Sequence, residues 1–424
     1  MTGTTPMTAI LTAVLGRTRA AGRRLLDLLG PTGAAARQSL VALTLNSATS
    51  LVAGAALGAI TGTLEALPGL LVMVPAAIGL RGNIAGSLGN RISTSIHTGT
   101  YRASFRRDSV VGVNLIASVA LTFVLSLGLA VVARLIAAAF DVENAIGVLD
   151  LAIVSVAGGL LASIVVIGAT VLLSTIGVRR GWDLDALVAP TTATLGDVVT
   201  IPALWLATFL LGRGAWTTGL GWALVVLSVA VFASALRARI AEVTLIIRES
   251  LPVLSAAVVL STLAGLVIQQ RLGVFAALPA LLVLEPAFVS SAGSLGGILA
   301  SRIGTNLHLG LVEPTLVPGV EARRDGVAIF ALFLPVFLLN GVGAWGVASV
   351  LDLASPGLAE MVVASLLGGA LAVAFVVALA YYGTVAAWRS NLDPDSYGIP
   401  VVTAAVDFVG AIALILTLGV LGIV

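Results

Sequence analysis

The stretch Leu67-Pro-Gly-Leu-Leu-Val-Met-Val-Pro75 returns later in the chain as Leu278-Pro-Ala-Leu-Leu-Val-Leu-Glu-Pro286. The two copies are offset by a constant 211 residues and align without a gap over residues 67–99, where 15 of 33 positions are identical. The chain's only histidines, His97 and His308, occupy equivalent positions near the end of this alignment. The chain therefore contains one unit twice, which is a common construction of membrane transporters.

A second motif, near the end of each copy, repeats with an offset of 210 residues. Its acidic and proline positions are Asp183, Asp185, Pro190 and Asp197 in the first copy, and Asp393, Asp395, Pro400 and Asp407 in the second. We therefore expect four parts. They are a cytoplasmic amphipathic segment at 1–36, a five-helix repeat at 37–212, a connecting transmembrane helix at 213–247 and a second five-helix repeat at 248–424.

The composition excludes a water-soluble domain. Hydrophobic residues make up 59% of the chain, charged residues only 10%, and the mean hydropathy is +1.13, whereas soluble domains carry about 25% charged residues. The absence of cysteine excludes disulfides and thiolate metal sites. The arginines lie between apolar stretches, which argues against nucleic-acid binding. No GxSxG, Walker or HExxH motif is present, so we do not expect an enzyme.

The apolar stretches predict an all-α polytopic membrane protein with about eleven transmembrane helices. They lie near 40–62, 67–97, 110–138, 150–178, 187–212, 216–235, 251–270, 278–308, 327–350, 358–386 and 398–423. Because one extra crossing separates the two sets of five, the two pseudo-repeats are expected to be parallel. With the N-terminus inside, 16 of the 22 arginines fall on the cytoplasmic side. We therefore expect a prokaryotic plasma-membrane protein with a cytoplasmic N-terminus and an outside C-terminus.

Asp197 and Asp407 lie near the middle of their predicted spans, where a charge costs about 2.5–3.5 kcal/mol on insertion scales. One interpretation is that each carboxylate only accepts hydrogen bonds and fixes helix packing. The other is that the pair faces the axis between the repeats and binds a cation. Carboxylate and carbonyl oxygens without His or Cys suit hard ions such as Mg²⁺.

The second span of each copy is rich in glycine and proline, which free backbone carbonyls where a helix lines a cavity. Small residues also permit close helix packing, so both interpretations stay open. The residues expected to line a pathway here are Gly82, Asn83 and Ser87 in the first copy, and Glu285, Gly293 and Ser294 in the second.

Four further acids precede the spans that carry the central aspartates. Such residues often cap helix N-termini, where the helix dipole favours them. Alternatively, they concentrate cations at the cytoplasmic mouth of a pathway. These acids are Asp183, Asp185, Asp393 and Asp395.

The segment from Pro75 through Asn83 to Thr94, together with the motifs that end at Asp197 and Asp407, resembles the membrane domain of MgtE-type magnesium channels. The duplicated form resembles solute carrier family 41. This resemblance implies transport of Mg²⁺, with Mn²⁺ or Co²⁺ as alternatives, and a metal site formed by Asp197 and Asp407. Asn83, which carries an amide oxygen, is expected to complete this site. The resemblance implies no organic cofactor. Two departures from the family pattern, Gly293-Ser294-Leu295 and Val406, suggest that the halves are unequal.

The expected partners are the lipid bilayer, the divalent cation and Na⁺ or H⁺ as a coupling ion. A monomer is expected to suffice, because the repeat mimics a dimer. The sequence leaves two rival functions open: a proton-coupled transporter of a small organic solute, and a membrane scaffold that transports nothing.

Overall fold

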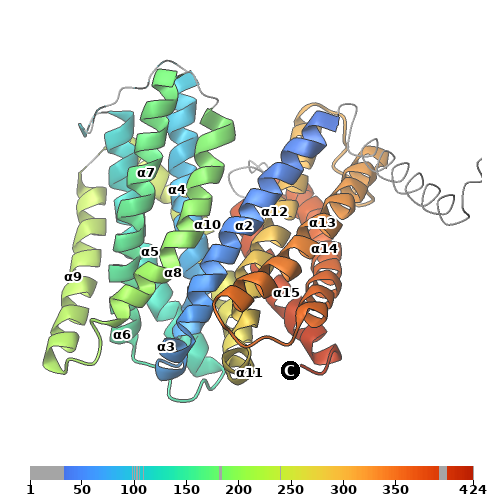
Figure 1. Cartoon of the computed structure of the whole chain (residues 1–424). Helices are drawn as coiled ribbons and strands as arrows, with labels where there is room; N and C mark the ends of the chain where they lie inside the picture. The colour runs from blue at the N-terminus through green and yellow to red at the C-terminus, as the bar shows by residue number, and fades with distance from the viewer. Residues whose placement is uncertain are drawn as a thin grey trace, which may run out of the picture.

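A computed structural model describes residues 33–97, 99, 101, 104, 106–107, 109–180, 184–238, 240–390 and 399–423. Every regular element in this part of the chain is helical (Figure 1). The elements are α2 (Gly33–Ala59), α3 (Thr61–Ala66), α4 (Leu70–His97), α5 (Val110–Ala139), α6 (Val148–Ile153), η1 (Val154–Gly158), α7 (Gly159–Arg180), α8 (Leu184–Thr208), α9 (Ala215–Arg237), α10 (Ala241–Gln269), α11 (Leu272–Ala277), α12 (Ala280–His308), α13 (Val320–Val350), α14 (Leu358–Arg389) and α15 (Ile399–Val420).

The Leu-Pro pair in the repeated motif ends a short helix in both copies. Proline disfavours the helical conformation of the residue before it. Accordingly, Leu67 after α3 has φ −126° and ψ 71°, and Leu278 after α11 has φ −128° and ψ 71°. Each leucine is followed by a long helix, α4 or α12. The same local sequence thus produces the same break 211 residues apart.

Ten helices are long and apolar enough to cross a membrane in the described part of the chain. α8 contains the shorter apolar segment Thr194–Thr208 and occupies the place of the remaining predicted span. Two helices begin earlier than hydropathy predicts, α10 at Ala241 and α13 at Val320. Both early turns contain charged residues, which lower the hydropathy without preventing helix formation.

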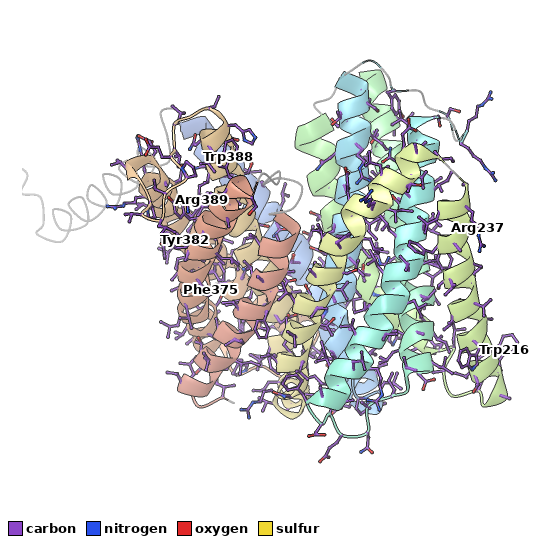
Figure 2. All side chains as sticks on the ribbon, turned by 180° about the vertical axis from the view of Figure 1, so that it is seen from behind. Trp216, Arg237, Phe375, Tyr382, Trp388 and Arg389 are labelled. Atoms are coloured by element: carbon purple, nitrogen blue, oxygen red, sulfur yellow. The ribbon has the colours of Figure 1, made fainter. Side chains whose placement is uncertain are left out.

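The two repeats run in the same direction. α3 and α11, which follow the first helix of each repeat, contact each other at one side of the molecule (Figure 1). α9 connects the two repeats in the sequence and lies at the outer edge of the molecule, where it runs from Trp216 at that side to Arg237 toward the other (Figure 2). Its surface is largely uncovered by other helices and apolar, with Trp216 and Trp222 exposed. The predicted fold class, two parallel repeats with one connecting helix, is confirmed.

The first helix of each repeat packs between the fifth helix of its own repeat and the second and third helices of the other repeat. α2 contacts α12 and α13, and α10 contacts α4 and α5 in the equivalent way. Figure 1 accordingly shows α2 among the helices of the second repeat. Hydrogen bonds cross this boundary on both sides: the Ser47 and Ser291 hydroxyls are 3.1 Å apart, and Arg91 donates to Ser250 at 3.2 Å.

Inside the two repeats, one hydrogen bond recurs almost unchanged. Ser155 Oγ donates to the carbonyl oxygen of Ser126 at 2.7 Å, and Ser365 Oγ donates to that of Phe337 at 2.6 Å. The donors are 210 residues apart and the acceptors 211. The repeats therefore share their internal helix packing as well as their sequence.

Candidate cation site

One cavity of about 350 Å³ lies between the repeats. Its walls come from the first, second and fifth long helices of each repeat, which are α2, α4 and α8 together with α10, α12 and α15. Several lining residues form pairs that are 211 positions apart, so the two halves contribute equivalent walls. These pairs are Ser50 and Ser261, Pro75 and Pro286, Gly82 and Gly293, and Asn83 and Ser294.

Three carboxylates line this cavity: Asp197 from α8, Asp407 from α15 and Glu285 from α12. Asp407 is close enough to interact electrostatically with both Asp197 and Glu285. The two aspartates are partly accessible through the cavity, whereas the Glu285 side chain is buried. Two repeat-related acids and one acid without a counterpart thus meet in the same space.

Hydroxyl and amide groups surround the carboxylates. Ser261 Oγ donates a 2.7 Å hydrogen bond to Asp407 Oδ2. Its repeat counterpart, Ser50, is buried beside Asp197, and its hydroxyl has no hydrogen bond of normal geometry with any described group. Asn46 and Ser290, also on the cavity wall, bond to each other across the boundary between α2 and α12. The lining is therefore rich in oxygen atoms.

Small residues keep the cavity open. A Cβ at Gly82 or at Gly293 would have no heavy atom within 4 Å, so these glycines face open space. A Cβ at Gly296 would instead meet Val376 at 2.9 Å, so this glycine serves packing. The helices nevertheless continue unbroken through Pro75 and Pro286. Glycines of these spans therefore face open space at some positions and permit close packing at others, and no break at the prolines frees backbone carbonyls.

Most of the predicted pathway residues lie together on the cavity wall, and one does not. Asp197, Asp407, Asn83, Gly82, Glu285, Gly293 and Ser294 all line it. Ser87 is absent from the lining and lies on α4 one helical turn beyond Asn83. Asp183, Asp393 and Asp395 lie outside the described residues, and Asp185 is in α8 without a described side chain.

Sequence reasoning missed five polar residues that line the cavity, namely Asn46, Ser50, Ser261, Ser290 and Thr403. The 211-residue offset was the available signal for two of them, because it matches Ser261 with Ser50 and so marks a polar position repeated within two apolar helices. Asn46 and Ser290 have no polar counterparts, since the equivalent residues are Ala257 and Gly79.

The ligand chemistry of the cavity suits a hydrated cation. Among the described residues, no three His, Cys, Asp or Glu side chains come close enough together to hold one ion. Mg²⁺ keeps several of its waters and binds through one or two carboxylates. Six waters occupy roughly 180 Å³ in the liquid, so a cavity of about 350 Å³ has room for the ion with its full first shell.

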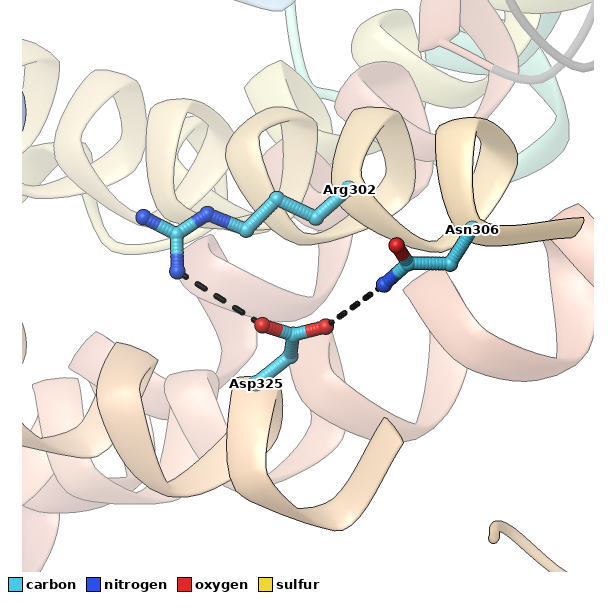
Figure 3. Close-up of polar contacts among 3 residues, drawn as sticks. All are labelled: Arg302, Asn306 and Asp325. Carbon is cyan, nitrogen blue, oxygen red and sulfur yellow. Dashed lines mark hydrogen bonds and ion pairs between the residues drawn. The ribbon is translucent and has the colours of Figure 1, made fainter. Parts of the chain in front are cut away.

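The arginines of the repeated motif are used differently in the two halves. Arg91 bonds to Ser250 in the other repeat. Arg302, its counterpart, forms a 3.7 Å ion pair with Asp325 of its own repeat, and Asn306 donates to the same carboxylate at 3.2 Å (Figure 3). His308 contacts the Gly304 carbonyl and the Trp388 ring. These groups do not line the cavity.

Comparison with known proteins agrees with this architecture. The family model MgtE, described as a divalent cation transporter, matches twice, at residues 74–207 and 285–417. Solute carrier family 41 member 2 of Xenopus laevis is 25% identical over 382 residues, which cover 84% of this chain and 66% of that protein. Solute carrier family 41 member 3 of Rattus norvegicus is 26% identical over 368 residues, or 80% and 77% of the two chains.

Human solute carrier family 41 member 2 is 22% identical over 383 residues, which make up 63% of its length. The chain therefore spans slightly less than two thirds of the two member 2 proteins. No solved structure gives a significant match. The two family matches together cover more than half of the chain and coincide with its two repeats, so the chain belongs to the MgtE family of divalent cation transporters.

Proposed function

We propose that this protein moves a divalent cation, Mg²⁺ in the first place, across the membrane through the cavity between its repeats. One observation supports this proposal above all: the repeat-related Asp197 and Asp407 line one cavity, and each lies within an apolar segment of its helix. Membership of the MgtE family supports the same substrate class. A buried acid without such a task would weaken the protein in the bilayer.

In this proposal Asp197 and Asp407 bind the ion from opposite sides, mostly through its water shell. Asn83 adds an amide oxygen, and Gly82 and Gly293 leave room for the hydrated ion to pass. The Ser261 hydroxyl orients the Asp407 carboxylate. The four acids Asp183, Asp185, Asp393 and Asp395 raise the local cation concentration at the cytoplasmic mouth. Both repeats are in one chain, so one molecule contains the whole site.

The proposal covers two mechanisms of Mg²⁺ transport, an exchanger coupled to Na⁺ or H⁺ and a gated channel. A Na⁺- or H⁺-coupled exchanger moves Mg²⁺ against its gradient when the partner ion's gradient is imposed, whereas a gated channel does not. Flux into liposomes measured with and without these gradients therefore separates the two mechanisms. Mn²⁺ and Co²⁺ are the competing substrates to include.

The function is tested by Mg²⁺ flux into liposomes that contain the purified wild type, D197N, D407N or the double variant. We expect the Mg²⁺ flux of each single variant to be at least about tenfold lower than that of the wild type, because a charge-assisted contact contributes about 1.5–3 kcal/mol. The double variant should show no flux. The matched control is D325N, an acid-to-amide change away from the cavity. Wild-type flux in the folded double variant would contradict the proposed site.

A further inference from the structure

A second cavity, of about 470 Å³, is a groove between α5 and α7 of the first repeat. α5 contributes Leu115, Val119 and Thr122, which share one face because they are spaced by four and three residues. α7 contributes residues from Leu160 to Thr175, a length of about 22 Å at the rise of an α-helix. One leaflet of the hydrocarbon core is about 15 Å thick, so the groove is long enough to follow a lipid chain across it.

The lining of the groove suits an apolar ligand in the membrane. Ile164 and Leu172 are 70% and 59% exposed, so this face of α7 meets the hydrocarbon of the bilayer. Each hydroxyl group in the lining already has a hydrogen-bond partner within the protein; the hydroxyls belong to Thr122, Ser163 and Thr175. A ligand in the groove therefore gains only van der Waals contacts from its walls.

In the second repeat, aromatic side chains occupy equivalent positions. At the repeat offsets of 211 and 210 residues, Val119, Thr122, Val171 and Leu172 correspond to Phe330, Phe333, Tyr381 and Tyr382. Phe333 packs on Phe337, with ring centroids 5.1 Å apart. The residues that line the groove in the first repeat include no aromatic side chain.

The two helix pairs also differ in how closely they approach. A Cβ at Gly326 of α13 would lie 3.4 Å from Val377 Cγ1 of α14, so these two helices touch. The equivalent residues of the first repeat, Leu115 and Ile167, line the groove instead. A Cβ at Gly168 would have no heavy atom within 4 Å. Walls that face open space lose van der Waals contacts, and water finds too few polar partners here to replace them. An apolar chain from the bilayer is the partner that restores these contacts.

Basic residues lie at one end of the groove. Tyr101 Oη is 3.1 Å from Thr175 Oγ1, so the loop between α4 and α5 lies against this end. Arg106 and Arg107 of this loop are exposed. Over residues 98–109 the sequence contains three arginines and one acid, Asp108. Arginines beside a membrane surface attract the phosphate of anionic phospholipids. The net positive charge is thus found where the headgroup of a lipid in the groove would lie.

We propose that the groove binds one anionic phospholipid, with an acyl chain along residues 115–122 and 160–175 and the phosphate beside Arg106 and Arg107. The acyl chain supplies the van der Waals contacts of the walls, and the arginines select the charge of the headgroup. A zwitterionic lipid fits the same walls but lacks the net charge. The inference is independent of the proposed cation pathway.

The test is native mass spectrometry of the purified full chain in detergent, titrated with phosphatidylglycerol or with phosphatidylcholine that carries the same acyl chains. V119F/T122F transplants two aromatic rings of the second repeat into the groove. G168F fills the groove from the other wall, where an added side chain meets open space. R106Q/R107Q removes the charge at the end of the groove.

The matched control is V131F, on an exposed face of α5 outside the groove, and thermal unfolding shows which variants fold. We expect the wild type to retain one phosphatidylglycerol, bound at least about tenfold more tightly than phosphatidylcholine. Both filling variants should bind phosphatidylglycerol at least about tenfold more weakly than the wild type, because the walls no longer contact the acyl chain. R106Q/R107Q should bind the two lipids equally, and V131F should match the wild type.

Wild-type affinity for phosphatidylglycerol in the folded filling variants would overturn the inference, and so would equal affinity of the wild type for the two lipids. A wild-type dimer that becomes a monomer in V119F/T122F and G168F would show that a second copy of the chain, and not a lipid, occupies the groove. If neither filling variant folds, unchanged lipid selectivity in R106Q/R107Q overturns the inference.

Discussion

Gly265 on α10 packs directly against the backbone carbonyl of Val72 on α4. The same contact joins Gly54 on α2 to Val283 on α12. The two glycines are 211 residues apart, and so are the two valines. In both places the absence of a side chain lets the first helix of one repeat lie against the second helix of the other. Since the first helices also contribute Ser50 and Ser261 to the cavity, these glycines position part of the cation site.

Replacing Gly265 with alanine should therefore destabilise the protein. The added Cβ would overlap the Val72 carbonyl, and overpacking of this kind costs about 1–3 kcal/mol. Thermal unfolding followed by tryptophan fluorescence measures the effect. Gly273→Ala is the matched control, because a Cβ there meets nothing within 4 Å and alanine favours the helix. An unfolding temperature of G265A equal to that of G273A would contradict the close contact.

Because α2 packs on α12 of the other repeat, a specific cross-link between these two helices is predicted. The Ser47 and Ser291 hydroxyls are 3.1 Å apart, so cysteines at both positions should form a disulfide under a membrane-permeant oxidant. The natural chain contains no cysteine, so there is no background. The product is identified by mass spectrometry of proteolytic peptides.

The control for this cross-link is the pair S47C/L80C. Leu80 is the residue equivalent to Ser291 in the first repeat, and it would face Ser47 if α2 packed on its own repeat. We expect this pair to remain reduced. A disulfide in S47C/L80C and none in S47C/S291C would show that α2 packs on α4 of its own repeat and not on α12.

A bulkier residue at Gly293 should block transport without unfolding the protein. A Cβ at this position faces open space, so Gly293→Val extends an apolar side chain into the cavity, where hydrophobic constrictions stop hydrated ions. We expect Mg²⁺ flux to fall at least about tenfold while the unfolding temperature stays the same. Gly419→Val, at an open position away from the cavity, is the control. Undiminished flux in G293V would place the pathway elsewhere.

The ion pair of Arg302 with Asp325 should contribute little. Both side chains are partly exposed, and pairs of this kind are worth at most about 1 kcal/mol. Asparagine already occupies the equivalent position in the first repeat, Asn114. Asp325→Asn is therefore expected to lower the free energy of unfolding by less than about 1 kcal/mol and to leave Mg²⁺ flux unchanged. A large loss of flux would give this pair a part in transport.

Much of the architecture was predictable because it depends on contiguous features of the sequence. The constant offset identified the repeat, and apolar length identified the spans. Helices α3 and α11 were not predicted, since six residues leave no periodic pattern. The packing of α2 and α10 on helices of the opposite repeat was not predictable either. The two copies have similar apolar surfaces, and a sequence offset does not say which copy a helix packs against.

The candidate site was predicted where a charge contradicts its apolar surroundings, as for Asp197, Asp407 and Glu285. Such residues stand out because burying a charge is costly. Ser87 was predicted because it adds a hydroxyl to the glycine-rich second span, but it lies one helical turn beyond Asn83 on α4 and does not line the cavity. Asn46 is on the first helix, and its presence in the cavity follows from the tertiary packing of α2 on α12.

The most direct test of the account is to locate Mn²⁺ by its anomalous scattering in crystals of the full chain. Mn²⁺ stands in for Mg²⁺, since both prefer oxygen ligands. The account predicts one ion in the cavity between Asp197 and Asp407, with at most one water between the ion and each carboxylate. A fully occupied Mn²⁺ elsewhere in the membrane region, with no ion between these two aspartates, would contradict it.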